Sequence, residues 1–483
     1  MTRDPELFDA VIFGGSVLDG SGADPVRADV GINGDRISAI GDLSEANAGS
    51  RIDASGRMVA PGFIDVHTHD DRAVLSSPDM PAKVSQGVTT VITGNCGVSL
   101  APLAGRDPPP PLNLLGNQDW FRFATVREYV DEVAAKPPAL NLAMLAGHST
   151  LRAGVMDELD RPATAAEIQR MEERLEEALC AGCIGMSTGL AYPPAIHAPT
   201  EEIVSLARRV AAHGGIYTTH MRNERDGVVD SVRETLDIGE RANVPVVISH
   251  HKCSGRENWG LTRQTLPLIA AARKRQAVNL DVYPYTASST VLMADWVEGA
   301  EKVLVTWSGP HPELAGRDFA GIRNEWGCST GEAVDRLQPA GAIYYQMDEA
   351  DLRRILAFED AMIGSDGLPH DTHPHPRLWG TFPRVLGHYA RDEKLFSLAQ
   401  AVRRMTTVPA AVFGLKGRGS IRTGGFADLV VFDAGAIIDA ASFESPIRPS
   451  PGIALVMVNG RAVWRAGAPS GERPGRILGR EAA

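Results

Sequence analysis

Short apolar runs alternate with amphipathic patterns through the middle of the chain, from about residue 62 to 414. Eight runs have the length and composition of buried strands: GFIDVH, TTVITG, NLAMLAG, CIGMSTG, GIYTTH, PVVISH, AVNLDVY and AMIGSD. Between most of them, apolar residues recur every three or four positions, as in EIQRMEERLEEALCAG, EEIVSLARRVAAHGG and SVRETLDIGERANV. Eight strands separated by crossovers predict an α/β protein built on a (β/α)8 TIM-like barrel over residues 62–414.

The two ends of the chain have a different pattern. Residues 1–61 and 415–483 hold short stretches of alternating apolar and polar residues, separated by Gly-rich turns such as Asn459-Gly460. We predict that both ends together form one small β-sandwich or β-barrel domain. Two separate β tails are the alternative, but they would leave apolar faces uncovered.

Two stretches of the middle region depart from regular alternation. Residues 97–140 form a long connection that contains the run Pro108 to Pro111, and we expect an extended loop there. The last two strand candidates are separated by far more than one helix. We therefore expect an inserted, lid-like segment at about 286–348, over the face on which a barrel carries its active site.

Composition limits the possible partners. The 483 residues carry 48 Lys and Arg against 60 Asp and Glu, a formal charge of −12, whereas a nucleic-acid protein needs a basic surface. The start, MTRDPELFDAVIFGG, lacks the layout of a signal peptide, and no apolar run approaches the roughly 18 residues of a membrane span. Five scattered Cys do not suggest a disulfide framework. We expect a soluble, cytoplasmic protein that acts on a small molecule, with no nucleic-acid or membrane partner; the oligomeric state stays open.

Ligand-type side chains stand at the ends of five strand candidates. Residues two apart on a strand point the same way, so the imidazoles of HTH, at the end of the first strand, can reach one metal. Each such residue alone is more often a hydrogen-bonded strand end, but together they predict a metal centre. Thiolate and imidazole ligands suit Zn²⁺. The candidates are His67, His69, Cys96, His220, His250 and Asp366.

The segments PGFIDVHTHDD, TGNCG, THMRNE, SHHK, GSDG and GGFADLVVFD resemble those of the amidohydrolase superfamily. Within it, the chain is similar to the N-acyl-D-amino-acid deacylases over essentially its full length. The resemblance implies that His67, His69, His220, His250 and Asp366 hold one or two metals. It also implies a D-configured substrate, which nothing in the spacing of residues reports.

One departure from the superfamily pattern is informative. Many dinuclear members bridge their metals with a carboxylated Lys or a Glu on strand four, and CIGMSTGL contains neither. A Cys on strand two is the deacylase alternative, and Cys96 occupies that position. We expect one tightly bound zinc at Cys96, His220 and His250, and a second, weaker site on the side of His67 and His69. This departure counts against a hydantoinase or dihydroorotase.

These ligands predict a hydrolytic mechanism. Zinc lowers the pKa of bound water to about 7, and Asp366 would accept the proton of that water and return it to the departing amine. The substrate carboxylate would be bound by Arg377, in the loop after Asp366, and by Tyr283 at the end of the seventh strand. Tyr344 and Met347 are candidates for an apolar wall of the substrate site, and packing within the lid is the alternative interpretation for both residues.

The predicted activity is zinc-dependent hydrolysis of N-acyl-D-amino acids to a D-amino acid and a carboxylate, with neutral or apolar side chains preferred. Three alternatives remain: a deacylase for acyl-D-aspartate or acyl-D-glutamate, a cyclic-amide hydrolase and a non-catalytic scaffold.

The remaining His, Lys and Cys residues that drew attention in the sequence carry weaker predictions. We expect His148 in packing or along the site, His251 in the core, and Lys252 as a strand cap or carboxylate partner. His370, His373 and His375 are expected at the rim of the site, and Cys180 and Cys183 as structural cysteines.

Overall fold

Eight parallel strands form a barrel at the centre of the computed structural model, which describes residues 7–480. The strands pair in sequence order from the first to the eighth. A parallel bridge between Thr68 and Gly367 brings the first and last strands together. The predicted barrel is confirmed. Its strands are β8 (Phe63–Asp65), β9 (Val88–Thr93), β12 (Asn141–Gly147), β13 (Gly185–Gly189), β14 (Ile216–His220), β15 (Val246–Ile248), β16 (Val278–Val282) and β20 (Met362–Ile363).

One helix after each strand covers the outside of the barrel. Amphipathic spacing buries one face of each helix against the strands, while polar residues face outward. The helix after the third strand begins at a capping box of Thr164 and Glu167, and the one after the fifth ends at Asn243 in the left-handed conformation, with φ of 53°. The covering helices are α2 (Pro81–Val84), α3 (Val126–Ala135), α5 (Ala165–Cys180), α7 (Thr200–Ala212), α8 (Val228–Ala242), α9 (Thr262–Ala272), α13 (Glu349–Ala357) and α15 (Leu398–Met405).

Shorter elements fill the connections. They are α1 (Ala73–Ser76), α4 (His148–Val155), α6 (Pro193–Ile196), α14 (Arg377–Arg384), a π-helix over Val385–Asp392, and α16 (Thr407–Val412).

The prediction of an extended loop over residues 97–140 is wrong in part. That segment contains a small hairpin of β10 (Leu103–Ala104) with β11 (Arg122–Phe123), and then α3. The helix forms because Thr125 caps it and Val126, Tyr129 and Val133 bury one face.

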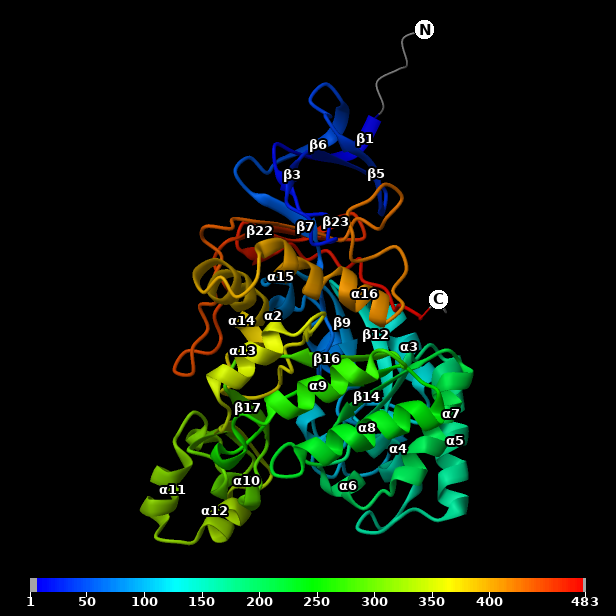
Figure 1. The fold of residues 1–483 in the computed structure, drawn as a ribbon, viewed down its shortest axis with the longest axis vertical. Coiled ribbons are helices and arrows are strands. Elements are labelled where there is room, and N and C mark those ends of the chain that lie inside the picture. The colour runs from blue at the N-terminus through cyan, green and yellow to red at the C-terminus, as the bar shows by residue number, and fades with distance from the viewer. Residues whose placement is uncertain (1–6, 481–483) are drawn as a thin grey trace.

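Strands from both ends of the chain share one sheet. Strand β7 pairs antiparallel with β21, with Pro61 opposite Leu429, and the sheet packs on a second, N-terminal sheet through apolar side chains of both. Figure 1 shows these blue and red segments side by side, beyond one end of the barrel. The first sheet contains β2 (Ser16–Val17), β3 (Val26–Arg27), β7 (Met58–Pro61), β21 (Leu429–Phe432), β22 (Ile453–Val458), β23 (Arg461–Arg465) and β24 (Ala468–Pro469); the second contains β1 (Leu7–Phe13), β4 (Asp29–Asn33), β5 (Arg36–Gly41) and β6 (Asn47–Asp53).

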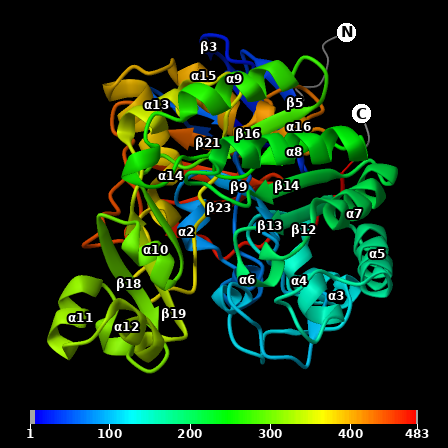
Figure 2. The ribbon, with the colours of Figure 1, turned by 60° about the horizontal axis from the view of Figure 1, so that its bottom comes forward.

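The segment between β16 and α13 folds as a small unit with a core of its own, which we call the lid (residues 286–348). An antiparallel sheet, in the order β17-β19-β18, packs against short helices. In Figure 2 the lid stands beside the barrel, at the lower left. Its elements are β17 (Ala287–Val291), α10 (Ala294–Glu298), β18 (Lys302–Ser308), α11 (Phe319–Trp326), α12 (Thr330–Leu337) and β19 (Ala340–Tyr345). Within residues 7–480, no helix combines the length and apolar character needed to cross a membrane.

Candidate active site at the carboxyl end of the barrel

The six predicted ligand residues converge at the carboxyl ends of the barrel strands, and all of them are buried. They form two groups, within each of which the candidate ligand atoms lie within 4.8 Å of one another. Cys96 belongs to both groups, so its thiol stands between two potential metal positions. One group is His67, His69, Cys96 and Asp366; the other is Cys96, His220 and His250.

The turn after β9 places Cys96 over the barrel. Gly94 begins this turn with φ of +77°, and a Cβ there would lie 2.0 Å from the carbonyl oxygen of Leu145, so glycine is required. The Sγ atom of Cys96 then lies 3.2 Å from His67 Nε2 and 3.3 Å from His250 Nε2. Burial by itself raises the pKa of the thiol, but the imidazoles of His67 and His250 hold that pKa well below its usual value. The geometry therefore favours a thiolate, the form that binds metal.

Three of the ligand candidates have left-handed backbone conformations. The φ angles of Cys96, His250 and Asp366 are 54°, 36° and 50°. Such conformations are uncommon for residues other than glycine and cost of order 1–3 kcal/mol each, and they gather where a structure must aim side chains at a common point. The strain coincides with the predicted site.

His220 provides a test of whether the site fits a metal. Both of its ring nitrogens are buried and lack a hydrogen-bond partner among the described residues. A neutral imidazole normally has a partner for its donor and for its acceptor when it is buried. A metal ion held with Cys96 and His250 would satisfy one of these nitrogens. The donor set of one thiolate and two imidazoles suits zinc.

Asp366 links the ligand groups to a buried arginine. Its Oδ1 lies 3.2 Å from His69 Nε2 and 3.5 Å from His67 Nε2, while its Oδ2 accepts a bond of 2.9 Å from Arg377 Nη2. Burial raises the pKa of this carboxyl, but Arg377 and His67 outweigh burial and hold it well below the usual value. The contacts of Asp366 therefore favour the ionised form of this carboxyl.

Two acidic residues that sequence reasoning missed orient the imidazoles. Both oxygens of Asp281 on β16 lie 3.3 Å from His67 Nδ1, and Oδ1 also accepts a 2.9 Å bond from the backbone N–H of His250. Glu224 lies 3.1 Å from His250 Nδ1 and 2.8 Å from Lys252 Nζ. Such partners fix the tautomer and direction of a ligating ring. The sequence does contain one indication of the role of Asp281, since it is an acidic residue inside the otherwise apolar strand NLDVY.

A cavity of about 330 Å³ opens beside this cluster. The predicted Tyr283 lies in its wall, and its hydroxyl has no hydrogen-bond partner within residues 7–480. Arg377, the other residue predicted to bind the substrate carboxylate, does not line this cavity, because it is fully buried behind Asp366. Its guanidinium lies 4.5 Å from the ring centre of Tyr283, and Nε and Nη1 lack partners in the described part of the chain. Other lining residues include Tyr192, Ile196, Arg222, Arg225, Asp226, Ser289, Asp295, Trp296 and Gln346.

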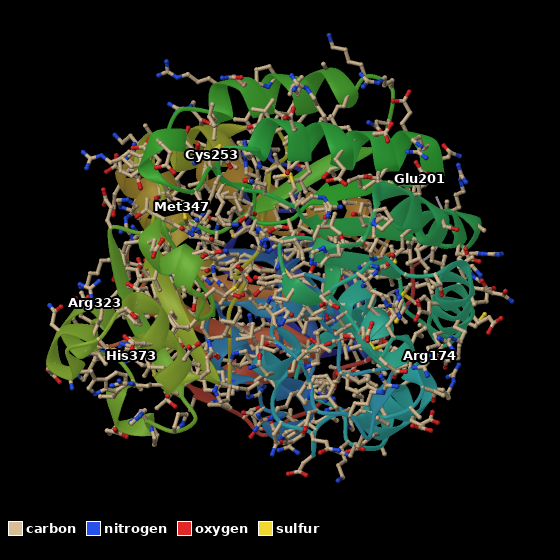
Figure 3. The ribbon with its side chains drawn as sticks, turned by 90° about the horizontal axis from the view of Figure 1, so that it is seen from below. Arg174, Glu201, Cys253, Arg323, Met347 and His373 are labelled. Carbon is tan, nitrogen blue, oxygen red and sulfur yellow. The ribbon has the colours of Figure 1, made fainter. Side chains whose placement is uncertain are left out.

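The structure does not bring Tyr344 and Met347 into this lining, and we correct that expectation. Tyr344 points into the core of the lid because of the alternation along β19, and its hydroxyl donates to the carbonyl of Val291. It packs behind Trp296, with ring centres 5.9 Å apart. Met347 lies with Cys253 in a separate, small pocket where the lid joins the barrel (Figure 3).

The remaining histidines stay outside the two ligand groups. His148 bonds to Glu202 at 2.9 Å, and His251 bonds to Thr265 at 2.8 Å, so both are packed by partners of their own. His373 lies 2.7 Å from the carbonyl oxygen of Phe443, and the Nδ1 of His375 accepts from the backbone N–H of the buried arginine. The loop that carries His373 and His375 is thus held by these bonds, and one of them fixes the backbone of Arg377.

A family model described as "Amidohydrolase family" matches residues 51–302 and 326–464. The chain belongs to the amidohydrolase family. Over 480 residues it is 56% identical to a D-aminoacylase of Alcaligenes xylosoxydans xylosoxydans, covering 99% of both chains. This similarity confirms the more specific resemblance to the N-acyl-D-amino-acid deacylases.

Solved structures of that group superpose on the whole chain. A D-aminoacylase studied for its binuclear metal centre, with one-metal activation and second-metal attenuation, is 55% identical, with a TM-score of 0.96 and coverage of 98% and 100%. An N-acyl-D-glutamate deacylase from Bordetella bronchiseptica, complexed with zinc and a phosphonate that mimics the tetrahedral intermediate, is 47% identical, with a TM-score of 0.95 and the same coverage.

Proposed function

We propose that this amidohydrolase cleaves the amide bond of N-acyl-D-amino acids, releasing a D-amino acid and a carboxylate. The observation that carries the proposal is the pair of ligand groups that share Cys96, one of which includes the carboxylate of Asp366. The similar proteins support it, since they are named as a D-aminoacylase and an N-acyl-D-glutamate deacylase. The free thiols of all five Cys agree with a reducing compartment, and we place the activity in the cytoplasm.

The donor set supports one zinc ion held by Cys96, His220 and His250, with a second, weaker position at His67, His69, Cys96 and Asp366. A zinc ion held by these residues would supply Lewis-acid chemistry for the scissile carbonyl and for the attacking water. The ring nitrogens of His220 have no hydrogen-bond partner within residues 7–480, and Nε2 lies 3.7 Å from Glu224 Oε2, so a metal ion in the first group would give one of these nitrogens a partner.

The protein's own groups supply proton transfer and binding. Asp366 Oδ1, which lies 3.5 Å from His67 Nε2 and 3.2 Å from His69 Nε2, accepts a proton from the attacking water and returns it to the leaving nitrogen. Arg377 keeps this carboxylate ionised. The hydroxyl of Tyr283, in the cavity wall, is a donor for the substrate carboxylate, whereas Arg377 lies behind Asp366 and acts through that carboxylate.

The charges in the cavity wall favour a neutral substrate side chain. The cation of Arg222 is already bonded to Glu234 at 2.9 Å, and Asp226 and Asp295 add negative charge to the same wall. The indole of Trp296 provides apolar surface near the ligand cluster, with its ring 6.5 Å from that of His220. An anionic side chain would therefore meet repulsion, whereas an apolar one would gain from burial.

One observation supports an acidic substrate as the second candidate. Arg225 lines the cavity, and its Nη2 is buried without a hydrogen-bond partner in the described residues. Its Nη1 donates to the backbone carbonyl of Asp295 at 3.1 Å, so the guanidinium is held at the wall. A carboxylate on the substrate side chain could occupy the free N–H group.

The deciding assay compares N-acetyl-D-methionine, its L enantiomer and N-acetyl-D-glutamate. We expect hydrolysis of the D-methionine derivative, at least about tenfold weaker hydrolysis of the glutamate derivative, and no turnover of the L enantiomer. Cys96→Ala is the control for the metal centre, and it should lose both zinc and activity. Equal rates on both enantiomers, or an unimpaired Cys96→Ala variant, would contradict the proposal. Hydantoin and dihydropyrimidine are included because a cyclic-amide hydrolase would cleave them; a non-catalytic scaffold would cleave none.

A further inference from the structure

The outer surface of the barrel carries a second group of metal-ligand side chains. Glu176, Cys180 and His213 each offer one ligand atom, and these three atoms all lie within 4.8 Å of one another. His213 Nε2 is 2.7 Å from Glu176 Oε1. All three residues are exposed, so the group is open to solvent and to ions.

Two packed helices bring these residues together. Glu176 and Cys180 are four apart on α5 and therefore lie on one face, and His213 follows the last residue of α7. Figures 1 and 2 both show α5 beside α7 at the edge of the barrel, and the two helices are in contact.

The geometry of the group does not depend on an ion. One turn before Glu176 on α5, Glu172 accepts bonds of 2.9 Å from Arg209 and 2.6 Å from Ser205 of α7. These bonds fix the spacing of the two helices next to the cluster. The two helices then need little reorganisation for a metal to bind, and preorganised sites bind more tightly.

We propose that Glu176, Cys180 and His213 form a surface zinc site, distinct from the active site. A thiolate, an imidazole nitrogen and a carboxylate oxygen are three of the four ligands that zinc takes in tetrahedral sites, and water completes the set. Binding at neutral pH releases the thiol proton, and the proton on His213 Nε2, which now bonds to Glu176, moves to Nδ1, so that Nε2 can bind the ion. The ion would join α5 to α7.

Cys180 and Cys183, the two cysteines of the C-x-x-C segment, lie in different environments. Cys183 is buried against the apolar core, and burial raises the pKa of its thiol well above the usual value, so it stays a thiol. Cys180 alone is exposed at the end of α5. A disulfide or a four-cysteine zinc knuckle is therefore not the function of this segment.

Alkylation by iodoacetamide, read by peptide mass spectrometry, tests the site directly. Cys96, Cys183 and Cys253 are buried, so the reactive thiols are Cys180 and the half-buried Cys328. We expect zinc to slow modification of Cys180 in a saturable way, by about tenfold when free zinc is roughly ten times the dissociation constant, because only unbound thiol reacts. Cys328 in the same sample is the internal control and should react at an unchanged rate, and Mg²⁺ should protect neither.

Variants separate a three-ligand site from binding by the thiol alone. His213→Ala and Glu176→Gln should each remove most of the protection, while turnover of the amide substrate is unchanged. The holoenzyme should also bind one zinc more than the Cys180→Ser variant. Equal alkylation rates with and without zinc would overturn the proposal, and so would protection that persists in both variants. None of these results depends on which amide the active site cleaves.

Discussion

Asp281 gives the sharpest test of how the metal ligands are held. Its side chain accepts two bonds, from the backbone N–H of His250 and from Nδ1–H of His67. In Asp281→Asn the amide oxygen can keep the first bond, but the amide nitrogen then faces another donor at His67. The replacement has the same shape but leaves a single, uncharged oxygen for the two partners, so it weakens the hydrogen bonding to His67 and leaves the packing intact.

The size of the effect follows from the lost bond. One hydrogen bond to a charged acceptor contributes about 1.5–3 kcal/mol, and about 1.4 kcal/mol corresponds to a factor of ten. We expect zinc affinity and kcat/KM for the D-substrate to fall by about ten- to a hundredfold, in line with the usual cost of losing a partner behind a metal ligand.

Chelator competition measures the zinc affinity, and steady-state kinetics measure kcat/KM. The matched control is Asn279→Ala, two residues earlier on β16, which removes hydrogen bonds to Arg273 and to the backbone of Leu280 away from the ligand cluster. It should lower stability without changing zinc binding. If Asp281→Asn keeps both zinc affinity and kcat/KM within about twofold of the parent, the carboxylate does not orient His67.

Three further perturbations have defined outcomes. Asp366→Asn should retain the zinc held by the other ligands but lose about 10²–10⁴ in kcat; turnover within tenfold of the parent, measured on metal-loaded protein, would remove Asp366 as the proton carrier. Lys83→Met should lower the free energy of unfolding by about 3–5 kcal/mol in urea titrations. Lys83 Nζ is buried 2.8 Å from Asp65 and 3.3 Å from Asp70, and the substitution would leave the charges of these two acids unpaired. A loss below about 1 kcal/mol would show that both acids are neutral. Burial raises the pKa of Glu202, but His148 and Arg152 outweigh burial and lower it to about 2. A carboxyl whose pKa is lowered by folding stabilises the fold at a pH above its pKa in the unfolded chain, and this stabilisation disappears as the pH falls toward 2. The difference in the free energy of unfolding between the parent and Glu202→Gln should therefore shrink from pH 5 to pH 2. A difference that stays constant over this range would contradict the coupling of Glu202 to His148 and Arg152.

The alternation of apolar runs and amphipathic segments was sufficient to predict the barrel. Strands buried on both faces must be apolar throughout, and helices that cover them must be amphipathic, so both leave local patterns. The candidate ligand residues were predictable for a related reason. The carboxyl ends of all barrel strands meet at one face, and a ligand-type residue at the end of a strand therefore identifies the site without knowledge of distances.

The three-dimensional arrangement decided what no local pattern records. The sharing of Cys96 between two ligand groups depends on the left-handed turn after Gly94, and the roles of Asp281 and Glu224 depend on which rings they face. The side-chain direction of Tyr344 follows from the register of β19 in the lid, which places it in the lid core. Sequence alone was sufficient to predict the fold, from periodicity along the chain, and the candidate ligand residues, from their positions at the ends of the predicted strands. Tertiary packing determined which atoms meet, because contacts between residues far apart in sequence leave no period to read.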